Sequence, residues 1–424
     1  MESKMIEKVS KTFIKPSSPT PQSLRLYNLS SYDQILFTDY GSMAYFFLNH
    51  PNHHIEISKI RHQLHDSLSK TLIHYYPFAG RLVKNDYIDC SDQGIEFLEV
   101  RIHCPILDIL KKNTKSYSIG LVFPREMVPK NANQESLVAV QLSHFDCGGI
   151  AIGVCLSSKI ADGSAATTFM EDWANLSRLS SHVPSPILPS DSHFPRKDGT
   201  FPLPFFDYKN CVTRKFIFPA KEIEKLKLKA NESGIDQPTR VEVLSALLYG
   251  CAMEATKSTI TGGGTSVILE AINLRPFLGL PQNTLGNIYS FYFCINKDEE
   301  EGIEFPALVR QLREAKLKFK NLPREKLSYE SQMMELEKCL KEVKNSSTSN
   351  IDVYYFSSFS RLGINKVDFG WGKAEWTTML QTQSQEMYLF GSIDGNGLEA
   401  LVTLEEEKMS LFEKNQHLLP FICF

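Results

Sequence analysis

Apolar positions in the first half of the chain follow two different spacings. Ile60 and the three leucines that follow it recur at every fourth residue, which predicts an amphipathic helix that ends before Pro77. Two later runs, 136–145 and 150–156, are mostly apolar and flank a Cys-Gly-Gly sequence, which predicts neighbouring strands joined by a tight turn. Helical spacing returns at 164–179. The first half is therefore expected to mix helices with strands.

The second half has the same mixture of patterns. Helices are expected at 220–232, at 240–255 and in two segments near 306–345, and strands at 213–218, 265–272, 288–295, 386–391 and 398–404. A chain of 424 residues exceeds what one hydrophobic core normally organises, and its two halves are alike, so we expect two α/β domains. A cleft between such domains is a common place for a small-molecule site.

A proline-rich segment separates the two halves. Six prolines fall within residues 182–206, and that density excludes both a helix and the interior of a sheet. We therefore expect an N-terminal domain over residues 1–182, a crossover linker over 183–212 and a C-terminal domain over 213–424.

Composition and charge exclude several classes of protein. The formal net charge of −3 provides no basic excess, so neither nucleic acid nor an anionic membrane is an expected partner. The chain begins without the apolar stretch of a signal peptide, and no apolar run approaches the roughly 18 residues that span a bilayer. The nine cysteines are scattered and form no C-x-x-C pair. They predict reduced thiols in the cytoplasm and no metal site.

The segment "GVCLSSKIADGSAATTF", residues 153–169, carries the main candidate chemistry. An apolar strand leads into polar residues, then a turn of small residues, then a helix. Loops that follow a strand in this way are a usual position for reactive side chains. Its candidates are Ser157, Ser158, Lys159 and Asp162.

Six separated motifs resemble those of the plant BAHD acyltransferases. In chain order they are "HYYPFAGRL" (74–82), "QLSHFDCGG" (141–149), "KIADG" (159–163), "INLRP" (272–276), "LGNIYSF" (285–291) and "DFGWG" (368–372). The opening of the chain is similar to the alkaloid-acetylating, vinorine synthase-like branch of that family. The resemblance extends over nearly the whole chain.

The resemblance implies both a fold and an activity. The fold is two similar mixed-sheet domains, like those of chloramphenicol acetyltransferase, with a channel between them. The activity is acyl transfer, here acetyl transfer from a coenzyme A thioester to the hydroxyl of an alkaloid or related plant specialised metabolite, without a metal. We also expect a monomer in the cytoplasm whose partners are small molecules.

The family signature, His-x-x-x-Asp-Gly, falls on Ser158, Asp162 and Gly163, and the histidine is missing. In the family that histidine is the general base. Imidazole suits the task because its pKa lies near neutrality, whereas a serine hydroxyl stays protonated. General-base catalysis contributes about 10²–10⁴-fold, so the replacement by Ser158 puts acyl transfer in doubt. Ser158 as a nucleophile would need an adjacent base, and Lys159 is normally cationic.

The resemblance also implies roles for other residues. Asp162 turns away from the channel and pairs with Arg275, and Asp368 and Trp371 support the channel from outside. Further residues are expected near the channel: Asn273, Asn287, Ser357, Ser358, Phe359 and His144. Phe359 stands where the family commonly has tryptophan, and His144 is the nearest other histidine in sequence.

Four interpretations of the missing histidine remain. The protein is an acyl-CoA-dependent O-acyltransferase in which Ser158 is natural or was introduced. Alternatively, the fold now catalyses a cyclisation, rearrangement or elimination of an alkaloid-type substrate, which an enclosed site with hydrogen-bond donors can support. Thirdly, it is a non-catalytic ligand-binding protein. Lastly, it is a decayed enzyme, which the intact motifs elsewhere do not favour.

Overall fold

The computed structural model describes residues 5–36, 38–49, 56–110, 119–124, 131, 134–179, 181–189, 211–259, 264–297, 304–344, 351–380, 384–392 and 395–423. The chain divides into two compact units. Unit 1 comprises Met1–Leu203, Gly279–Ile288 and Leu362–Leu380, and unit 2 comprises Pro204–Leu278, Tyr289–Arg361 and Gln381–Phe424. Most of the predicted linker, 183–212, lies outside the described residues.

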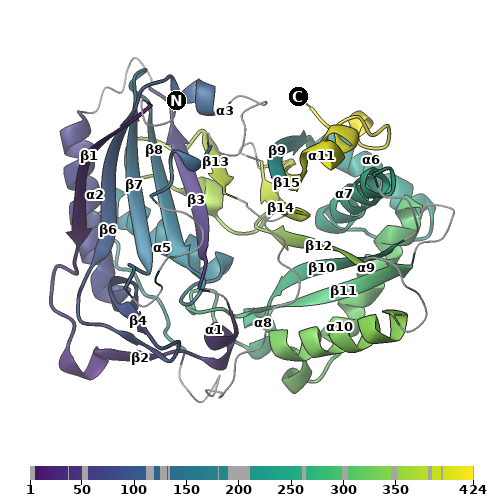
Figure 1. The fold of residues 1–424 in the computed structure, drawn as a ribbon, viewed down its shortest axis with the longest axis horizontal. Helices are drawn as coiled ribbons and strands as arrows, with labels where there is room; N and C mark the ends of the chain where they lie inside the picture. Colours follow the sequence, from purple (N-terminus) through teal and green to yellow (C-terminus); the bar gives the residue numbers. More distant parts are fainter. Residues whose placement is uncertain are drawn as a thin grey trace. The chain divides into compact units, whose positions relative to one another are not determined.

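Unit 1 is built on a mixed six-stranded sheet in the order β1-β6-β7-β8-β3-β13 (Figure 1). Its strands are β1 (Ile6–Ile14), β3 (Tyr40–Phe47), β6 (Ile95–Ile102), β7 (Val138–Phe145), β8 (Ile150–Ser157) and β13 (Trp376–Met379). Only β6 and β7 run parallel; the other neighbours are antiparallel. The sequence prediction assigned β13 to the second domain, but its pairing with β3 puts it in the sheet of unit 1.

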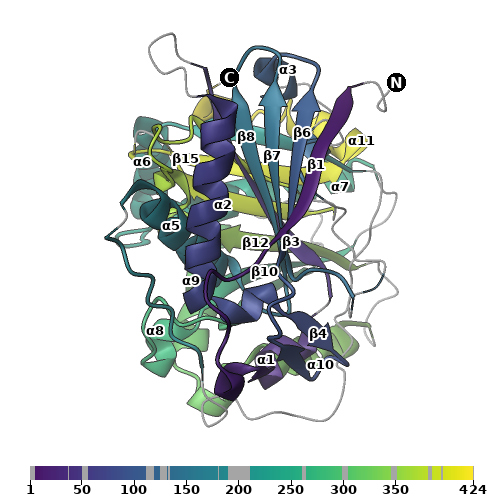
Figure 2. The same cartoon turned by 90° about the vertical axis from the view of Figure 1, so that its left-hand side faces the viewer.

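Two long helices, α2 (Ile57–His74) and α5 (Gly163–Arg178), cover one face of this sheet (Figure 2). The predicted apolar stripe of α2 is confirmed, because Ile60 and the leucines that follow it at four-residue intervals are all buried. Helix α3 (Ile106–Leu110) belongs to a core on the other face, where Ile106 and Ile109 pack with side chains of β3 and β6.

The predicted turn between β7 and β8 is also confirmed. Gly148 has a φ of +79°, a conformation that favours glycine, and its N–H donates to the carbonyl of Phe145 at 2.9 Å. A smaller three-stranded sheet, β2-β5-β4, completes unit 1. It consists of β2 (Leu26–Asn28), β4 (Arg81–Val83) and β5 (Tyr87–Asp89), and the short helix α1 (Ser31–Ile35) follows β2.

Unit 2 is built on a second mixed six-stranded sheet, in the order β11-β10-β12-β14-β15-β9 (Figure 1). Its strands are β9 (Cys211–Phe218), β10 (Thr265–Asn273), β11 (Tyr289–Lys297), β12 (Ile351–Ser358), β14 (Glu386–Gly391) and β15 (Leu398–Glu405). Its helices are α6 (Ala220–Glu232), α7 (Arg240–Lys257), α8 (Arg275–Leu278), α9 (Phe305–Lys320), α10 (Tyr329–Lys344) and α11 (Glu406–Phe412).

The alternation of side chains along β10 gives unit 2 a core on each face of its sheet. Ile268 packs into the larger core with side chains of α6, α7, α9 and α11. Val267 and Leu269 point the other way and pack against Leu336 and Leu340 of α10. The predicted α/β fold with two mixed-sheet domains is confirmed. Within the described residues, no helix has the length and apolar character needed to cross a membrane.

Candidate functional site

Ser158 follows directly on β8 in unit 1 and is held against the residue that precedes β3. Its N–H donates to the carbonyl oxygen of Asp39 at 2.9 Å, which continues the pairing of Ser157 with Tyr40. The Ser158 hydroxyl lies near the Asp39 carboxylate and lowers its pKa. Both residues are half-buried. The position that the family signature gives to histidine therefore holds a serine–aspartate pair.

Burial raises the pKa of the Asp39 carboxyl above its ordinary value. The hydrogen bond from Ser158 and the positive charge of Lys159 oppose that rise without cancelling it. Asp39 is thus a stronger base than an exposed aspartate.

Lys159 is buried and caps the C-terminal end of α1. Its Nζ donates to the carbonyl oxygens of Asp33 at 3.2 Å, of Gln34 at 3.0 Å and of Leu36. Burial lowers the pKa of Lys159 to about 8, and the neighbouring carboxylates Asp33 and Asp39 oppose that shift. Three carbonyl acceptors require three N–H donors, which only the ammonium form has. Lys159 is therefore a fixed cation, without a lone pair to accept the proton of Ser158.

Asp33 is a second carboxylate close to Lys159, and it is fully enclosed. Its Oδ2 accepts from the N–H and hydroxyl of Ser30, at 3.1 and 2.6 Å, in a capping box at the start of α1. Its Oδ1 accepts from the backbone N–H and side-chain Nδ2 of Asn287, at 3.0 and 2.7 Å. Burial raises the pKa of Asp33, and these four bonds oppose the rise.

The segment Gly279–Ile288 returns to unit 1 to hold the loop after β8. Asn287 Nδ2 also donates to the carbonyl oxygen of Ser158 at 2.7 Å, and Gly286 forms a parallel bridge with Ala161. The Ile288 N–H donates to Asp162 Oδ2 at 3.0 Å. Both side-chain N–H groups of Asn287 thus have acceptors in unit 1. The motif "LGNIYSF" supplies the partners that fix the backbone of the loop containing Ser158.

Asp162 is the N-cap residue of α5, which begins at Gly163. Its Oδ1 accepts from the N–H of Ala165 at 2.8 Å. With the bond from Ile288, both carboxylate oxygens of Asp162 have structural donors. The pairing of Asp162 with Arg275 would join the two units and stays a prediction.

Five of the predicted residues of the second half belong to unit 2 and are described there by their own contacts: Asn273, Arg275, Ser357, Ser358 and Phe359. Arg275 begins α8 and is buried, and its N–H and Nη1 donate to Asn273 Oδ1 at 3.0 and 3.3 Å. Ser357 and Ser358 end β12, where the Ser358 and Ser360 hydroxyls lie 2.8 Å apart. Phe359 stacks on Phe390 with ring centroids 5.4 Å apart. Their place near a channel stays a prediction.

His144 lies near the opposite end of the strand pair from Ser158. It is paired with Ile150, the first residue of β8, so roughly 25 Å of strand separates it from Ser158 at about 3.3 Å per residue. Its Nε2 is 3.1 Å from Glu99 Oε1, and burial lowers the pKa of the imidazole. The structure does not bring His144 together with Ser158.

The "DFGWG" motif forms a tight loop of unit 1. Asp368 Oδ1 accepts from the N–H groups of Gly370 and Gly372, at 2.8 and 3.1 Å, and both glycines have positive φ. Trp371 stacks on Phe369, with centroids 5.6 Å apart, and meets Phe47 edge-on. Asp368 and Trp371 therefore shape and pack the loop, while the predicted support of a channel stays untested.

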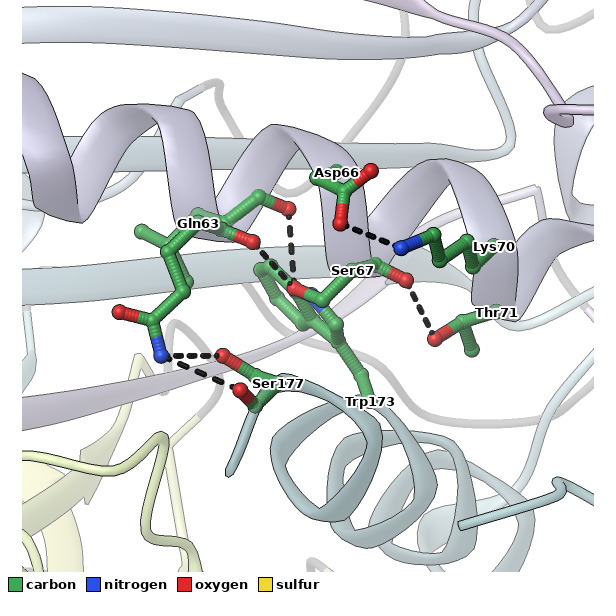
Figure 3. Close-up of polar contacts among 8 residues, drawn as sticks. Gln63, Asp66, Ser67, Lys70, Thr71, Trp173 and Ser177 are labelled. Atoms are coloured by element: carbon green, nitrogen blue, oxygen red, sulfur yellow. Dashed lines mark hydrogen bonds and ion pairs between the residues drawn. The ribbon is translucent and has the colours of Figure 1, made fainter. Parts of the chain in front are cut away.

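A polar network joins helices α2 and α5 (Figure 3), and two of its side chains, Gln63 and Ser177, also reach this loop. Gln63 Nε2 donates to the Phe369 carbonyl at 2.6 Å and to Ser177 Oγ at 3.0 Å. Trp173 Nε1 donates to Ser67 Oγ at 3.0 Å. The loop is thus held by part-buried hydrogen bonds from two helices that are distant in sequence.

Within the part of the chain that the structure describes, no three histidine, cysteine, aspartate or glutamate side chains are grouped so as to hold a metal ion. None of the nine cysteines is in a disulfide.

The profile of the Transferase family matches residues 4–419, nearly the whole chain. The chain belongs to the BAHD acyltransferase family. Akuammiline synthase 1 of Alstonia scholaris is 55% identical over 98% of each chain. Deacetylvindoline O-acetyltransferase of Catharanthus roseus is 50% identical over 98% of this chain and 97% of its own length.

Solved structures agree with the fold of this BAHD member. The crystal structure of vinorine synthase superposes with a TM-score of 0.84 at 29% identity, over 98% of both chains. TRI101 of F. graminearum, complexed with coenzyme A and T-2 mycotoxin, superposes with a TM-score of 0.70 over 94% of this chain and 99% of its own. At 14% identity the latter likeness concerns the fold alone.

Sequence reasoning missed two carboxylates of this BAHD site. Asp33 had a signal, because Ser-x-x-Asp is close to the pattern of a capping box. Asp39 had none, because only the pairing of β3 with β8 puts it beside Ser158. Lys159 was recognised as a cation, but its burial against α1 was not.

Proposed function

We propose that this protein transfers an acyl group, in the first instance acetyl, from a coenzyme A thioester to a hydroxyl group of an alkaloid or related plant specialised metabolite. The observation that carries the proposal is the similarity over nearly the whole chain to enzymes named as alkaloid acetyltransferases. Besides the 50% identity given above, minovincinine 19-hydroxy-O-acetyltransferase of Catharanthus roseus is 48% identical. Coenzyme A as cosubstrate is further supported by its presence in the TRI101 complex.

The local structure around Ser158 supports retained function. The loop from Ser158 to Gly163 keeps its contacts to Asp39, to Asn287 and to the backbone of Ile288. A decayed site has no reason to keep buried polar partners in register, since each unpaired buried group costs about 1–3 kcal/mol. The substitution therefore changes one functional group in an otherwise intact frame.

The test is turnover of the purified protein with acetyl-CoA and a panel of hydroxylated alkaloids. Mass spectrometry of the products detects the added acyl group, and a thiol reagent follows the release of free coenzyme A. We expect stoichiometric acyl product and free thiol. If no acceptor and no thioester gives both, the proposal is wrong.

Ser158→His serves as the comparison variant. It restores the group that the family signature contains, and general-base catalysis contributes about 10²–10⁴-fold. We expect acetylation by Ser158→His to equal or exceed that of the unmodified protein. Loss of acetylation in this variant, with folding intact, would argue against a family-like arrangement at this position.

A second candidate function is a cyclisation, rearrangement or elimination of an alkaloid-type substrate. The observation that favours it is the absence of an imidazole at Ser158, beside a hydroxyl and a carboxylate that can still exchange protons with a ligand. The same assay separates the two functions, because these reactions change the substrate without an acyl mass gain or thiol release. If the protein only binds a ligand, added alkaloid would raise its Tm and no product would form.

A further inference from the structure

We infer that Asp39 is the proton acceptor of this enzyme, taking the role that the family signature gives to an imidazole, and that Ser158 positions it. This inference rests on the proposed acyl transfer. It assigns a catalytic role to a residue outside the signature, in the strand connection that precedes β3.

The first support is position. Ser158 N–H and Asp39 C=O are joined at 2.9 Å, so the two residues lie side by side at one end of the β3–β8 pair. The Ser158 hydroxyl lies near the Asp39 carboxylate and favours its ionised form. A group bound directly to Ser158 is within reach of a substrate that approaches Ser158.

The second support is acceptor capacity together with exposure. The groups whose hydrogen bonding lowers the pKa of Asp39 are the Ser158 hydroxyl and its own backbone N–H, whereas an ionised carboxylate has roughly four lone-pair sites. It is also half-buried, as Ser158 is, while Asp33, Lys159 and Asn287 are buried. Among these groups, Asp39 combines a lone pair with access to a ligand.

The third support is electrostatic. Efficient general bases have pKa values near the working pH, and burial shifts Asp39 in that direction. The charged group that interacts with Asp39 is Lys159, whose three N–H donors are used on the carbonyls at the end of α1. Asp33 faces the same lysine. The charge of Lys159 favours the ionised form of Asp39, and Lys159 does not take the proton itself.

The reaction then balances without a further reagent. The acceptor hydroxyl gives its proton to the Asp39 carboxylate as its oxygen bonds to the acyl carbonyl carbon. The carbon–sulfur bond breaks with its electron pair on sulfur. The thiolate takes the proton from Asp39, so an ester and free coenzyme A are formed and the carboxylate is regenerated.

The central experiment compares Asp39→Asn with Asp66→Asn, each alone and each combined with Ser158→His. Asparagine keeps the shape and an oxygen acceptor for Ser158 but cannot accept the proton. Asp66 lies on α2 in an exposed pair with Lys70 and is the matched control (Figure 3). We expect Asp39→Asn to lower kcat by about 10²–10⁴-fold with little change in KM. Asp66→Asn should change it less than about twofold.

The Ser158→His background shows whether the two groups perform the same task. With an imidazole present, the loss on Asp39→Asn should shrink to less than about tenfold. The acid limb of the pH–rate profile should follow the Asp39 carboxyl in the unmodified protein and the imidazole in Ser158→His. If Asp39 had only a structural role, Asp39→Asn would lower kcat by the same factor in both backgrounds. The acid limb of the pH–rate profile would then be the same with and without Ser158→His.

The remaining outcomes separate this inference from the proposed function. Acyl transfer that survives Asp39→Asn within about threefold overturns the inference and leaves the function standing. Transfer that appears only after Ser158→His also overturns it, since Asp39 then fails as a base. Absence of transfer in both backgrounds removes the function and the inference together.

Ser158→Ala completes the test by separating positioning from covalent catalysis. A positioning hydroxyl predicts a loss of about tenfold or less, with no acyl group on the protein. An acyl adduct on Ser158 in intact-protein mass spectra, together with loss of turnover in Ser158→Ala, would overturn direct proton transfer to Asp39.

Discussion

Asp33 lies in helix α1 and Asp39 follows that helix, and both carboxylates face Lys159, yet their surroundings differ. Asp33 is buried and accepts four hydrogen bonds from Ser30 and Asn287. Asp39 is half-buried, and the Ser158 hydroxyl and its own backbone N–H lower the pKa of its carboxyl. The number of donors around each carboxylate, more than its pKa direction, separates a structural role from a chemical one. A carboxylate whose lone pairs all accept hydrogen bonds stabilises the fold, and a carboxylate with lone pairs to spare can bind a substrate proton.

The largest expected effect is on folding. Asp33→Ala removes the acceptor of four buried or half-buried donors, and we expect the free energy of unfolding to fall by about 3–5 kcal/mol. Asp39→Ala should change it by less than about 1 kcal/mol because fewer donors are stranded. Urea unfolding followed by fluorescence measures both. Equal losses for the two variants would remove the distinction drawn above.

A smaller loss of stability is expected at Asn287, which contacts both Asp33 and Ser158. Asn287→Ala deletes the donors to Asp33 Oδ1 and to the Ser158 carbonyl, and we expect a loss of about 2 kcal/mol. Asn283→Ala, in the same segment, deletes an exposed bond to the Ser185 carbonyl and is the control. We expect it to lose less than about 0.5 kcal/mol. Similar losses for both would show that the segment acts as a whole and not through Asn287.

Lys159→Met tests the electrostatic part of the comparison. Removing the cation takes away a force that lowers the pKa of Asp39, so that pKa should rise. The acid limb of the pH–rate profile should then move to higher pH. An unmoved limb, in a variant whose circular dichroism spectrum is unchanged, would mean that Lys159 does not act on the catalytic carboxyl.

The smallest expected effect is the pH dependence of stability. Burial raises the folded-state pKa of Asp39 above the ordinary 3.8, so the folded state binds the proton more tightly than the unfolded state. Its contribution to stability is fully present below the unfolded pKa and is lost as the pH rises through the folded pKa. As the pH rises through that window, the unmodified protein should therefore lose stability relative to Asp39→Asn, and the Tm of the variant should rise relative to that of the unmodified protein. A constant difference would indicate an unshifted carboxyl.

Much of the fold was accessible from the sequence because it follows from local pattern. The spacing of Ile60 and its leucines predicted α2, and the apolar runs around Gly148 predicted β7, β8 and their turn. The resemblance of six motifs to those of the BAHD acyltransferases indicated the family. The sequence did not predict which distant strands pair, because the residues of a strand do not identify its neighbour in the sheet.

The residues of the candidate site also fall into those that a sequence motif identified and those that only strand pairing revealed. Ser158 and Asp162 were found from their motif, and Asp162 has structural donors on both oxygens as expected of a residue that fixes the loop. Asp39 was missed because neither composition nor periodicity distinguishes it from other polar residues between elements. Its candidacy arises only from the register that pairs Tyr40 with Ser157.

The pairing of β13 with β3 has a consequence for synthesis of the chain. Glu375, just before β13, accepts from the backbone N–H of Leu48, 327 residues earlier. During translation the β3 edge of the first sheet stays unpaired until the first two segments of unit 2, residues 204–278 and 289–361, have been made. An open strand edge invites pairing with other chains. Nascent or truncated chains that end before Trp376 should therefore depend more heavily on chaperones than the finished protein does.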